Sequence, residues 1–221
     1  MSRSARRTTL IRGSALLLVV GLAGGLYIGL RGDRTPTSVE VAPGSIPSAV
    51  TRTQFSFHLG AIRPIPTGRK KNAESAARAA AQRISATLDR LYDTGFLDPA
   101  SWQQGTYGDA WRLFTSDALP TARADESTLT LGAHAGGRYQ VVYPHAGHLA
   151  VRVLMDRYGH PSTAVAIVSF AARAMELNGQ KAVIRSGGQY FLRPSPRGWA
   201  IYGYQVRRDD AFLSSMAAIK P

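Results

Sequence analysis

The sequence predicts an α+β fold, with an N-terminal single transmembrane helix followed by a domain of helices packed on a curved antiparallel sheet. An uncharged run over residues 13–30 predicts the transmembrane helix. Apolar residues recur with helical spacing over 72–93, and shorter helical segments follow to about residue 126. Beyond that point, runs rich in β-branched and aromatic residues alternate with turn residues. Helices and strands in separate blocks are typical of the α+β class.

The uncharged run holds 18 residues, from Gly13 to Leu30, between Arg12 and Arg31. As a helix it is roughly 27 Å long, close to the ~30 Å hydrocarbon core of a bilayer. We expect an uncleaved membrane anchor. A cleaved secretory signal is the alternative, because Gly21-Leu22-Ala23 has the small-x-small pattern of a cleavage site, although cleavage there leaves an apolar new terminus.

Charge around the predicted span indicates its orientation. Arg3, Arg6, Arg7 and Arg12 precede the span, and fewer arginines follow it closely. The positive-inside rule therefore predicts a cytoplasmic tail over residues 1–12 and an extracytoplasmic remainder. The expected location is the cell membrane, and the lipid bilayer is the first expected partner of the chain.

The predicted span also carries a row of glycines. Gly21, Gly25 and Gly29 lie four residues apart and therefore share one face of a helix. Small residues let two helix backbones approach closely in lipid. We expect this row to contact another membrane protein or a second copy of the chain. The alternative is that glycine is simply frequent in membrane helices.

The composition limits both the chemistry and the partners. The chain has 27 Lys and Arg residues against 14 Asp and Glu, a net charge of +13, and no cysteine. Disulfides, thiol catalysis and cysteine-ligated zinc are therefore excluded. A basic exported surface attracts anionic lipid head groups or anionic wall polymers, whereas nucleic acid is not an expected partner outside the membrane. A solvated basic surface without a partner is the alternative.

A linker is expected between the span and the domain, over residues 31–71, because prolines and glycines interrupt any regular pattern there. Within it, Phe55–Leu59 is either a short strand or a segment that docks on the domain, and the prolines from Pro64 onward end it. The folded domain is expected over 72–210, with a C-terminal tail over 211–221.

The first and longest helix of the domain is expected over Asn72–Asp93, with Gly95 as its stop. Its apolar face begins with alanines and ends with bulky residues, which suits a helix lying closely on a sheet.

Three shorter helices are expected next. Asp98 with Pro99 has the pattern of an N-cap followed by proline in the first turn. Asp109 is expected to cap the second, and Asp117 the third, which reaches about Glu126.

Six strands are expected after the helices, joined by short turns that favour antiparallel neighbours. Asn178-Gly179 is a hairpin turn, and Gly187-Gly188 marks a bulge or bend within a strand. The last strand alternates, with Ala200, Tyr202, Tyr204 and Val206 on one face. The expected strands are 129–131, 140–143, 149–156, 163–174, 181–192 and 199–207.

This order of elements, together with the ending Gly198-Trp199-Ala200-Ile201 and then Tyr204-Gln205-Val206, resembles the NTF2-like superfamily. That resemblance implies a cone in which a long first helix and shorter companions lie in the concavity of a bent antiparallel sheet. The anchor, linker and domain together resemble membrane-anchored exported proteins of actinobacteria, including Mce-associated proteins and VirB8/TcpC-type components of secretion and conjugation machines. Residues 95–99, Trp102 and residues 105–109 resemble exported actinobacterial proteins without a known activity.

No residue pattern predicts catalysis, a cofactor or a metal. The spacing of His145 and His148 suits a metal only on a helix, whereas this region is expected to be loop and strand. Hydrolase, nucleotide-binding and zinc-protease patterns do not occur in the sequence. Aspartate–tyrosine pairs, as used by some NTF2-like enzymes, have candidate members here, but no spacing fixes a pair.

Four aromatic residues between the first helix and the sheet, Trp102, Tyr107, Trp111 and Phe114, form the remaining candidate cluster. They are expected to close the open end of the cone as core, and the alternative is a pocket for a lipid or another small apolar ligand. The residues of this candidate pocket are Tyr92, Trp102, Tyr107, Trp111 and Asp109.

Together these features predict a non-catalytic, single-pass membrane protein that presents an extracytoplasmic NTF2-like domain as a scaffold or accessory subunit of an envelope transport or secretion complex. A protein that binds or modifies a small apolar ligand is the first alternative. Docking on an anionic cell-wall polymer is the second.

Overall fold

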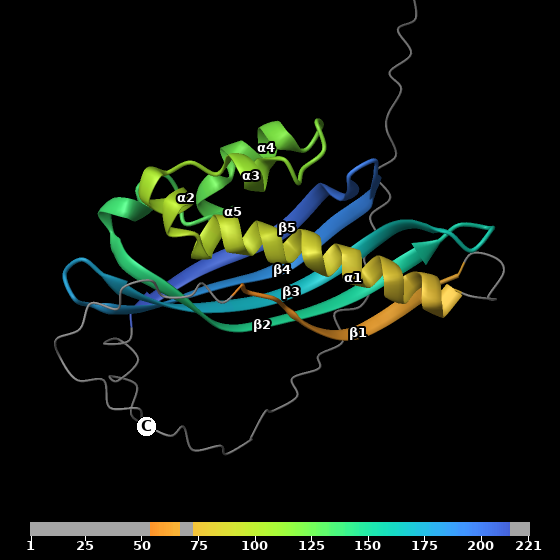
Figure 1. The fold of residues 1–221 in the computed structure, drawn as a ribbon, viewed down its shortest axis with the longest axis horizontal. Helices are drawn as coiled ribbons and strands as arrows, with labels where there is room; N and C mark the ends of the chain where they lie inside the picture. The colour runs from red at the N-terminus through yellow and green to blue at the C-terminus, as the bar shows by residue number, and fades with distance from the viewer. Residues whose placement is uncertain (1–53, 67–72, 213–221) are drawn as a thin grey trace, which may run out of the picture. The chain divides into compact units, whose positions relative to one another are not determined.

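The computed structural model describes residues 54–66 and 73–212. The predicted cytoplasmic tail, the span with its glycine row, most of the linker and the end of the C-terminal tail lie outside these residues. Within them the chain is α+β, as predicted, with helices on a five-stranded sheet. Figure 1 shows α1 along one face of the sheet and α2 to α5 on the same side.

The sheet has the order β1-β2-β3-β4-β5. β2 to β5 are antiparallel neighbours, but β1 pairs in parallel with β2, so the sheet is mixed and the prediction of a purely antiparallel sheet is wrong at this edge. Every helix of the described residues lies between β1 and β2 in the chain, which allows the parallel return to the same edge. The strands are β1 His58–Ile65, β2 Tyr139–Met155, β3 Pro161–Glu176, β4 Lys181–Ser195 and β5 Gly198–Phe212.

The segment before α1 both docks and forms a strand. Phe55 and Phe57 are buried, with 8% and 5% exposed, and β1 begins directly after them. β1 continues through Pro64, which an edge strand tolerates because one side of its backbone needs no partner. The folded domain therefore begins before residue 72, and part of the expected linker belongs to the sheet.

The first helix is confirmed as α1, Ala73–Tyr92. Gly95 does not stop the helical path, because the chain continues through a π-helical turn, η1 Asp93–Leu97. A side chain at Gly95 would approach the carbonyl oxygen of Leu129 to 3.1 Å, so this glycine serves close packing. The low helix propensity of glycine therefore does not end the helix at Gly95, because the packing of this residue against Leu129 outweighs it.

The short helices differ in their caps. Asp98 caps α2, Pro99–Gln104, as predicted, with its Oδ1 accepting a hydrogen bond from the Ala100 N–H at 3.2 Å. Asp109 and Asp117 are not side-chain caps, because Tyr107 holds the N-cap position of α3 and Ala118 that of α4. The remaining helices are α3 Gly108–Trp111, α4 Leu119–Ala124, α5 Glu126–Leu129 and the 3₁₀ turn η2 Ala135–Gly137. The strand expected over 129–131 is absent from this described region, which holds the end of α5 and its exit.

Two β-bulges change the expected strand pattern. The strands expected over 140–143 and 149–156 are one strand, β2, whose register shifts between Pro144 and Ala146. In β5 the register shifts next to Tyr202, so Trp199 and Ile201 are buried while Tyr202 is 41% exposed. The expectation that Ala200 to Val206 alternate without interruption is therefore wrong, because an extra residue reverses the facing of the strand.

The glycine of the β3–β4 turn and the two glycines of β4 serve different purposes. Asn178-Gly179 forms the predicted hairpin turn between these strands, with Gly179 at a φ of 83°. Gly187-Gly188 is not a bulge, because the register with both neighbouring strands runs on without a shift. Gly188 instead lies where the backbone of β5 approaches closely.

Phe170 of β3 is the centre of the aromatic core. Its ring lies 5.4 Å from Phe55, 4.9 Å from Tyr92 and 5.3 Å from Phe96, measured between ring centroids. The sheet, α1, η1 and the segment before β1 thus meet at one side chain. Edge and tilted contacts of this kind stabilise beyond the area they bury.

Asp89 of α1 holds the segment before β1. The N–H of Phe57 donates to Asp89 Oδ1 at 2.8 Å, and the Ser85 hydroxyl donates to Oδ2 at 3.4 Å. Burial raises the pKa of Asp89 above its ordinary value, and these two hydrogen bonds lower it by less. The ionised form of Asp89 is therefore less stable in the folded protein than in the unfolded chain, although its oxygen accepts the hydrogen bond of the Phe57 N–H.

We expect Asp89→Asn to keep or raise the free energy of unfolding at pH 7, because the amide oxygen still accepts from Phe57 without a buried charge. Asp89→Ala is expected to lower it by about 1–2 kcal/mol, because the Phe57 N–H loses its partner. Since the folded-state pKa lies above the unfolded one, wild-type stability should fall as pH rises between the two values, and Asp89→Asn should remove that slope. Urea denaturation from pH 4 to pH 7 measures both effects; equal destabilisation by both variants would contradict this assignment.

Candidate functional site

An open cleft lies between the C-terminal half of α1, the chain from α3 to Thr115, and the turn that joins β4 to β5. Its volume is about 1010 Å³. We call it the arginine cleft, because arginines come from each of its walls: Arg83 and Arg90 of α1, Arg112 after α3, Arg193 of β4 and Arg197 of the β4–β5 turn.

The α1 wall of the arginine cleft follows from helix geometry. Arg83, Thr87, Arg90 and Thr94 all line the cleft, at spacings of three and four residues that place them on one side of the helical path. This side differs from the buried face that packs on the sheet. The two arginines are exposed, so they remain available to a ligand.

The wall opposite α1 is held by backbone hydrogen bonds. The Thr115 N–H donates to the Ile201 carbonyl at 2.8 Å, and the Ile201 N–H donates to the Leu113 carbonyl at 2.9 Å. The segment from Leu113 to Thr115 is thereby paired to the outer edge of β5. The arginine cleft is therefore bounded on this side by a continuation of the sheet.

Positive charge dominates the arginine cleft, because Asp109 is the one acidic residue in its lining. Arg112 Nη1 lies 2.9 Å from Asp109 Oδ1, and Arg193 Nη2 lies 3.7 Å from Asp117 Oδ2. These side chains are 50–83% exposed, so each pair contributes about 0–1 kcal/mol.

The other three arginines of the cleft have no such partner. No carboxylate of the described residues lies within 4.0 Å of Arg83, Arg90 or Arg197. Guanidinium groups remain charged at any physiological pH and donate in a planar fork that matches phosphate and carboxylate oxygens. The cleft therefore concentrates unpaired donors of the kind that bind oxyanions.

The other lining residues suit binding rather than proton transfer. The floor contains Trp199 and Phe114, each 7% exposed, with Leu113 and Pro194. Hydroxyls of threonine and serine add neutral donors, and the Oγ1 of Thr115 is buried without a hydrogen-bond partner in the described chain. The lining contains no histidine, cysteine, tyrosine or lysine that would act as a base near neutral pH.

The residues of the predicted apolar pocket lie in two different places. Tyr92, Trp102, Tyr107 and Trp111 are buried core residues, and none of them lines the arginine cleft. Asp109 points into that cleft instead, with 66% of its side chain exposed. The structure therefore separates the acidic candidate from the four aromatic ones.

The buried tyrosines of that set are hydrogen-bonded. The Tyr92 hydroxyl lies 2.9 Å from the Ser186 hydroxyl, and the Tyr107 hydroxyl donates to the Gly132 carbonyl at 2.9 Å. Burial raises the pKa of Tyr107 to about 12. Both phenols are thus neutral partners within the core, in keeping with the expectation that these aromatic residues belong to the core.

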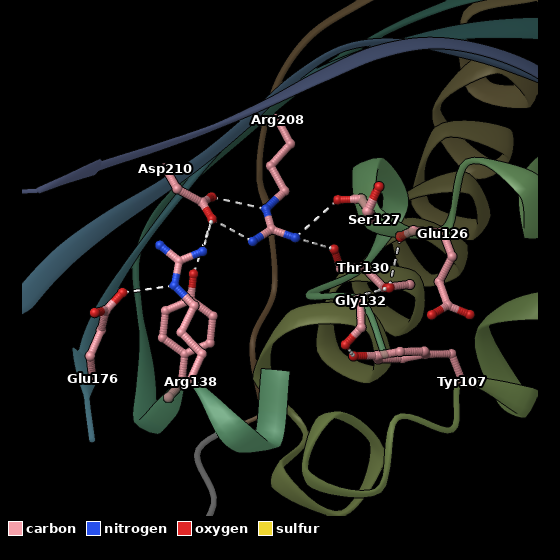
Figure 2. A network of polar contacts seen from close by, with 10 residues as sticks. Tyr107, Glu126, Ser127, Thr130, Gly132, Arg138, Glu176, Arg208 and Asp210 are labelled. Atoms are coloured by element: carbon pink, nitrogen blue, oxygen red, sulfur yellow. Dashed lines mark hydrogen bonds and ion pairs between the residues drawn. The ribbon is translucent and has the colours of Figure 1, made fainter. Parts of the chain in front are cut away.

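A second charged cluster, drawn in Figure 2, is satisfied internally. Arg208 binds both oxygens of Asp210, at 2.9 and 2.6 Å, and donates to the carbonyls of Ser127 and Thr130 at 3.0 and 2.6 Å. Arg138 adds contacts to Glu176 at 2.7 Å and to Asp210 at 3.2 Å. Because donors and acceptors are matched, this cluster ties α5 to β5 and leaves no charge for a ligand.

Histidines do not assemble a metal site in the described residues. His58 and His148 lie side by side on β1 and β2, with ring centroids 5.9 Å apart. Neither this pair nor any other site within residues 54–66 and 73–212 brings together three His, Asp or Glu side chains that could hold an ion. In the same residues no helix is long and apolar enough to span a membrane.

Comparison of the chain with models of known protein families, with curated proteins and with solved structures finds no match. The assignment of a function therefore rests on the arginine cleft and on the sequence. Reasoning from sequence missed this cleft. One signal in the sequence was the separation of Arg83 and Arg90 by two helical turns, which places both on one face of the helix. That spacing gives no indication that Arg193 and Arg197 line the same cleft.

Proposed function

We propose that the domain is a non-catalytic docking module that binds an oxyanion-bearing ligand, phosphate above all, in the arginine cleft. The observation that carries this proposal is the ratio of five arginines to one carboxylate in a single open cleft, with three arginines unpaired within the described chain. This is the anionic docking function for which the net charge of the sequence already provides a basis.

Electrostatic reasoning supports a bound anion over a solvated surface. Like charges gathered on three elements repel one another, and a low-dielectric floor such as Trp199 and Phe114 reduces the screening between them. The negative charge of a bound oxyanion offsets this repulsion between the arginines. The oxyanion also accepts charge-assisted hydrogen bonds from several guanidinium groups at once. Scattered surface arginines would not gain this benefit.

We further propose the setting in which this module works. The uncharged run over residues 13–30 and the arginines before it support a membrane anchor with the domain outside the membrane. α1 lying on the sheet supports an NTF2-like cone. In this proposal the protein is an accessory subunit of an envelope complex, with Gly21, Gly25 and Gly29 in contact with a partner span.

The proposal predicts salt-sensitive binding of an anionic probe. Full-length protein in mild detergent should bind tripolyphosphate in isothermal titration calorimetry, and the affinity should fall as sodium chloride is raised. Arg83→Gln/Arg90→Gln/Arg197→Gln should weaken binding about 10- to 150-fold, because each exposed contact contributes roughly 0.5–1 kcal/mol.

The matched control is Arg152→Gln/Arg173→Gln/Arg185→Gln, which removes the same charge from exposed strand positions outside the arginine cleft. It should retain wild-type affinity within about twofold once salt is at physiological strength, because long-range attraction is then screened. If both triple variants weaken binding equally, net charge and not the arginine cleft determines the affinity, and the proposal fails.

A further inference from the structure

The arginine cleft does not end at the arginines. A second hollow of about 480 Å³ adjoins it along the N-terminal half of α1. Both hollows share Arg83 and the β4–β5 turn with its flanking residues, so they form one groove beside the helix. We call the second part the alanine groove, since Ala76, Ala79 and Ala80 form its helical wall.

The two parts of this groove have different chemistry. In the alanine groove Arg83 is the single charged residue of the lining, and the other walls are Pro161 and the turn around Pro194 and Pro196. Small side chains leave a smooth helical wall, and proline restricts the backbone opposite. A ligand there meets neutral surface, while its neighbouring part in the arginine cleft meets four further guanidinium groups.

The size and openness of the groove favour an extended ligand. Pockets of roughly 300–1,000 Å³ enclose most of a small ligand. The arginine cleft alone reaches that upper limit, remains open to solvent, and continues into the alanine groove. A single phosphate can contact few of the five arginines at one time, whereas a chain with repeated oxyanions can contact several.

The aromatic residues argue against recognition of nucleobases. Proteins that bind single-stranded nucleic acid present exposed aromatic faces on which bases stack. Trp199 and Phe114 are the aromatic residues of the two linings, and each is 7% exposed. The groove therefore offers charge and neutral wall to a polymer backbone, without stacking platforms.

We infer that the groove holds a linear polymer of phosphate-linked polyol or sugar units, with phosphates in the arginine cleft and a neutral stretch of backbone along the alanine groove. This inference rests on the proposed function, because it names the class of anion that the arginine cleft binds. It adds that recognition depends on chain length and involves residues without charge.

The test compares glycerol 1-phosphate with a poly(glycerol phosphate) oligomer, using full-length protein in detergent and calorimetry at matched phosphate concentration. The oligomer should bind about a hundredfold more tightly, because neighbouring phosphates engage further arginines at high effective concentration. Ala79→Trp should weaken binding of the oligomer about tenfold, because the indole fills the alanine groove. Its binding of glycerol 1-phosphate should not change. Gln82→Trp is the control, an equally large change at an exposed α1 position outside both linings.

The outcomes separate this inference from the proposed function. Equal affinity for the oligomer and for glycerol 1-phosphate overturns the inference and leaves anion binding in place. No binding of either probe overturns both. Tighter binding of an oligodeoxythymidylate with the same number of phosphates would also overturn the inference, because it would reveal recognition of bases. Thermal denaturation of Ala79→Trp and Gln82→Trp shows whether either change acts through folding instead.

Discussion

Gly188→Ala is expected to lower the free energy of unfolding by about 3–5 kcal/mol, enough to unfold a marginally stable domain. Gly188 lies in the middle of β4 at a φ of 145°, a backbone conformation that residues with a side chain rarely adopt. A Cβ atom there would overlap the carbonyl oxygen of Gln205 and lie 2.8 Å from the Cα of Val206. Both atoms belong to the backbone of the neighbouring strand, so relief requires that β5 move away.

Gly187→Ala provides the matched control for this prediction. The two glycines are adjacent in β4, but a Cβ at Gly187 would meet its nearest atom, the Val168 carbonyl oxygen, at 3.4 Å. We expect this variant to change the free energy of unfolding by less than about 1 kcal/mol. Urea denaturation of both variants measures the difference. Similar stability of the two would show that β5 can relax and that the strained approach at Gly188 is not required.

The features that sequence predicted correctly depend on neighbours in the chain. The alanine-rich α1, the cap at Asp98 and the hairpin at Asn178-Gly179 each follow from helix periodicity or turn geometry over a few residues. The α+β class follows in turn from the order of these elements.

The features that sequence did not predict depend on pairing between distant segments. β1 is parallel to β2 because the intervening helices return the chain to the same edge, which no local pattern encodes. Each of the bulges in β2 and β5 inserts one residue, which reverses the facing of the residues that follow. An alternation read along β5 alone therefore placed Ala200 and Tyr202 on one face with Tyr204 and Val206, although the bulge puts the two pairs on opposite faces.

The arginine cleft shows the same limit for the site. Arg83 and Arg90 read as the solvated face of a helix, and Arg197 reads as part of a loop. They share a cleft only because the β4–β5 turn lies beside α1. The predicted pocket failed to include them because it was assembled from aromatic residues, which here fill the core between α1 and the sheet.

The second large effect on stability is expected at the charged cluster of Arg208 and Asp210, near the C-terminal end of β5. Arg208→Met is expected to lower the free energy of unfolding by about 3 kcal/mol, because it removes the charged partner of the largely buried Asp210 carboxylate and the donor to the Thr130 carbonyl. The Arg208 side chain is 10% exposed and supplies hydrogen bonds to Asp210, Ser127 and Thr130. Arg138 at 3.2 Å and the Tyr139 hydroxyl at 3.0 Å still donate to Asp210, which limits the loss. Arg207→Met, an exposed neighbour, should change stability by less than about 0.5 kcal/mol.

The pH dependence distinguishes a lost ion pair from lost packing. Burial raises the pKa of Asp210, but the hydrogen bonds and charge of Arg208 lower it by more. The pKa of Asp210 therefore lies below its ordinary value. A carboxyl whose folded-state pKa is depressed stabilises the fold above its unfolded pKa, and this contribution disappears as pH falls through the folded value. Wild-type stability should therefore decline below about pH 4, and Arg208→Met should show a smaller decline.

A double variant completes the argument for this cluster. In Arg208→Met/Asp210→Asn the carboxylate charge is removed together with its partner, so part of the stability lost in Arg208→Met should return. Urea denaturation at pH 7 measures the recovery. If the double variant is as unstable as the sum of the two single variants, the pair contributes no coupling. The loss then comes from the unpaired carbonyls of Ser127 and Thr130, which would make Arg208 chiefly a clamp that holds α5 against the sheet.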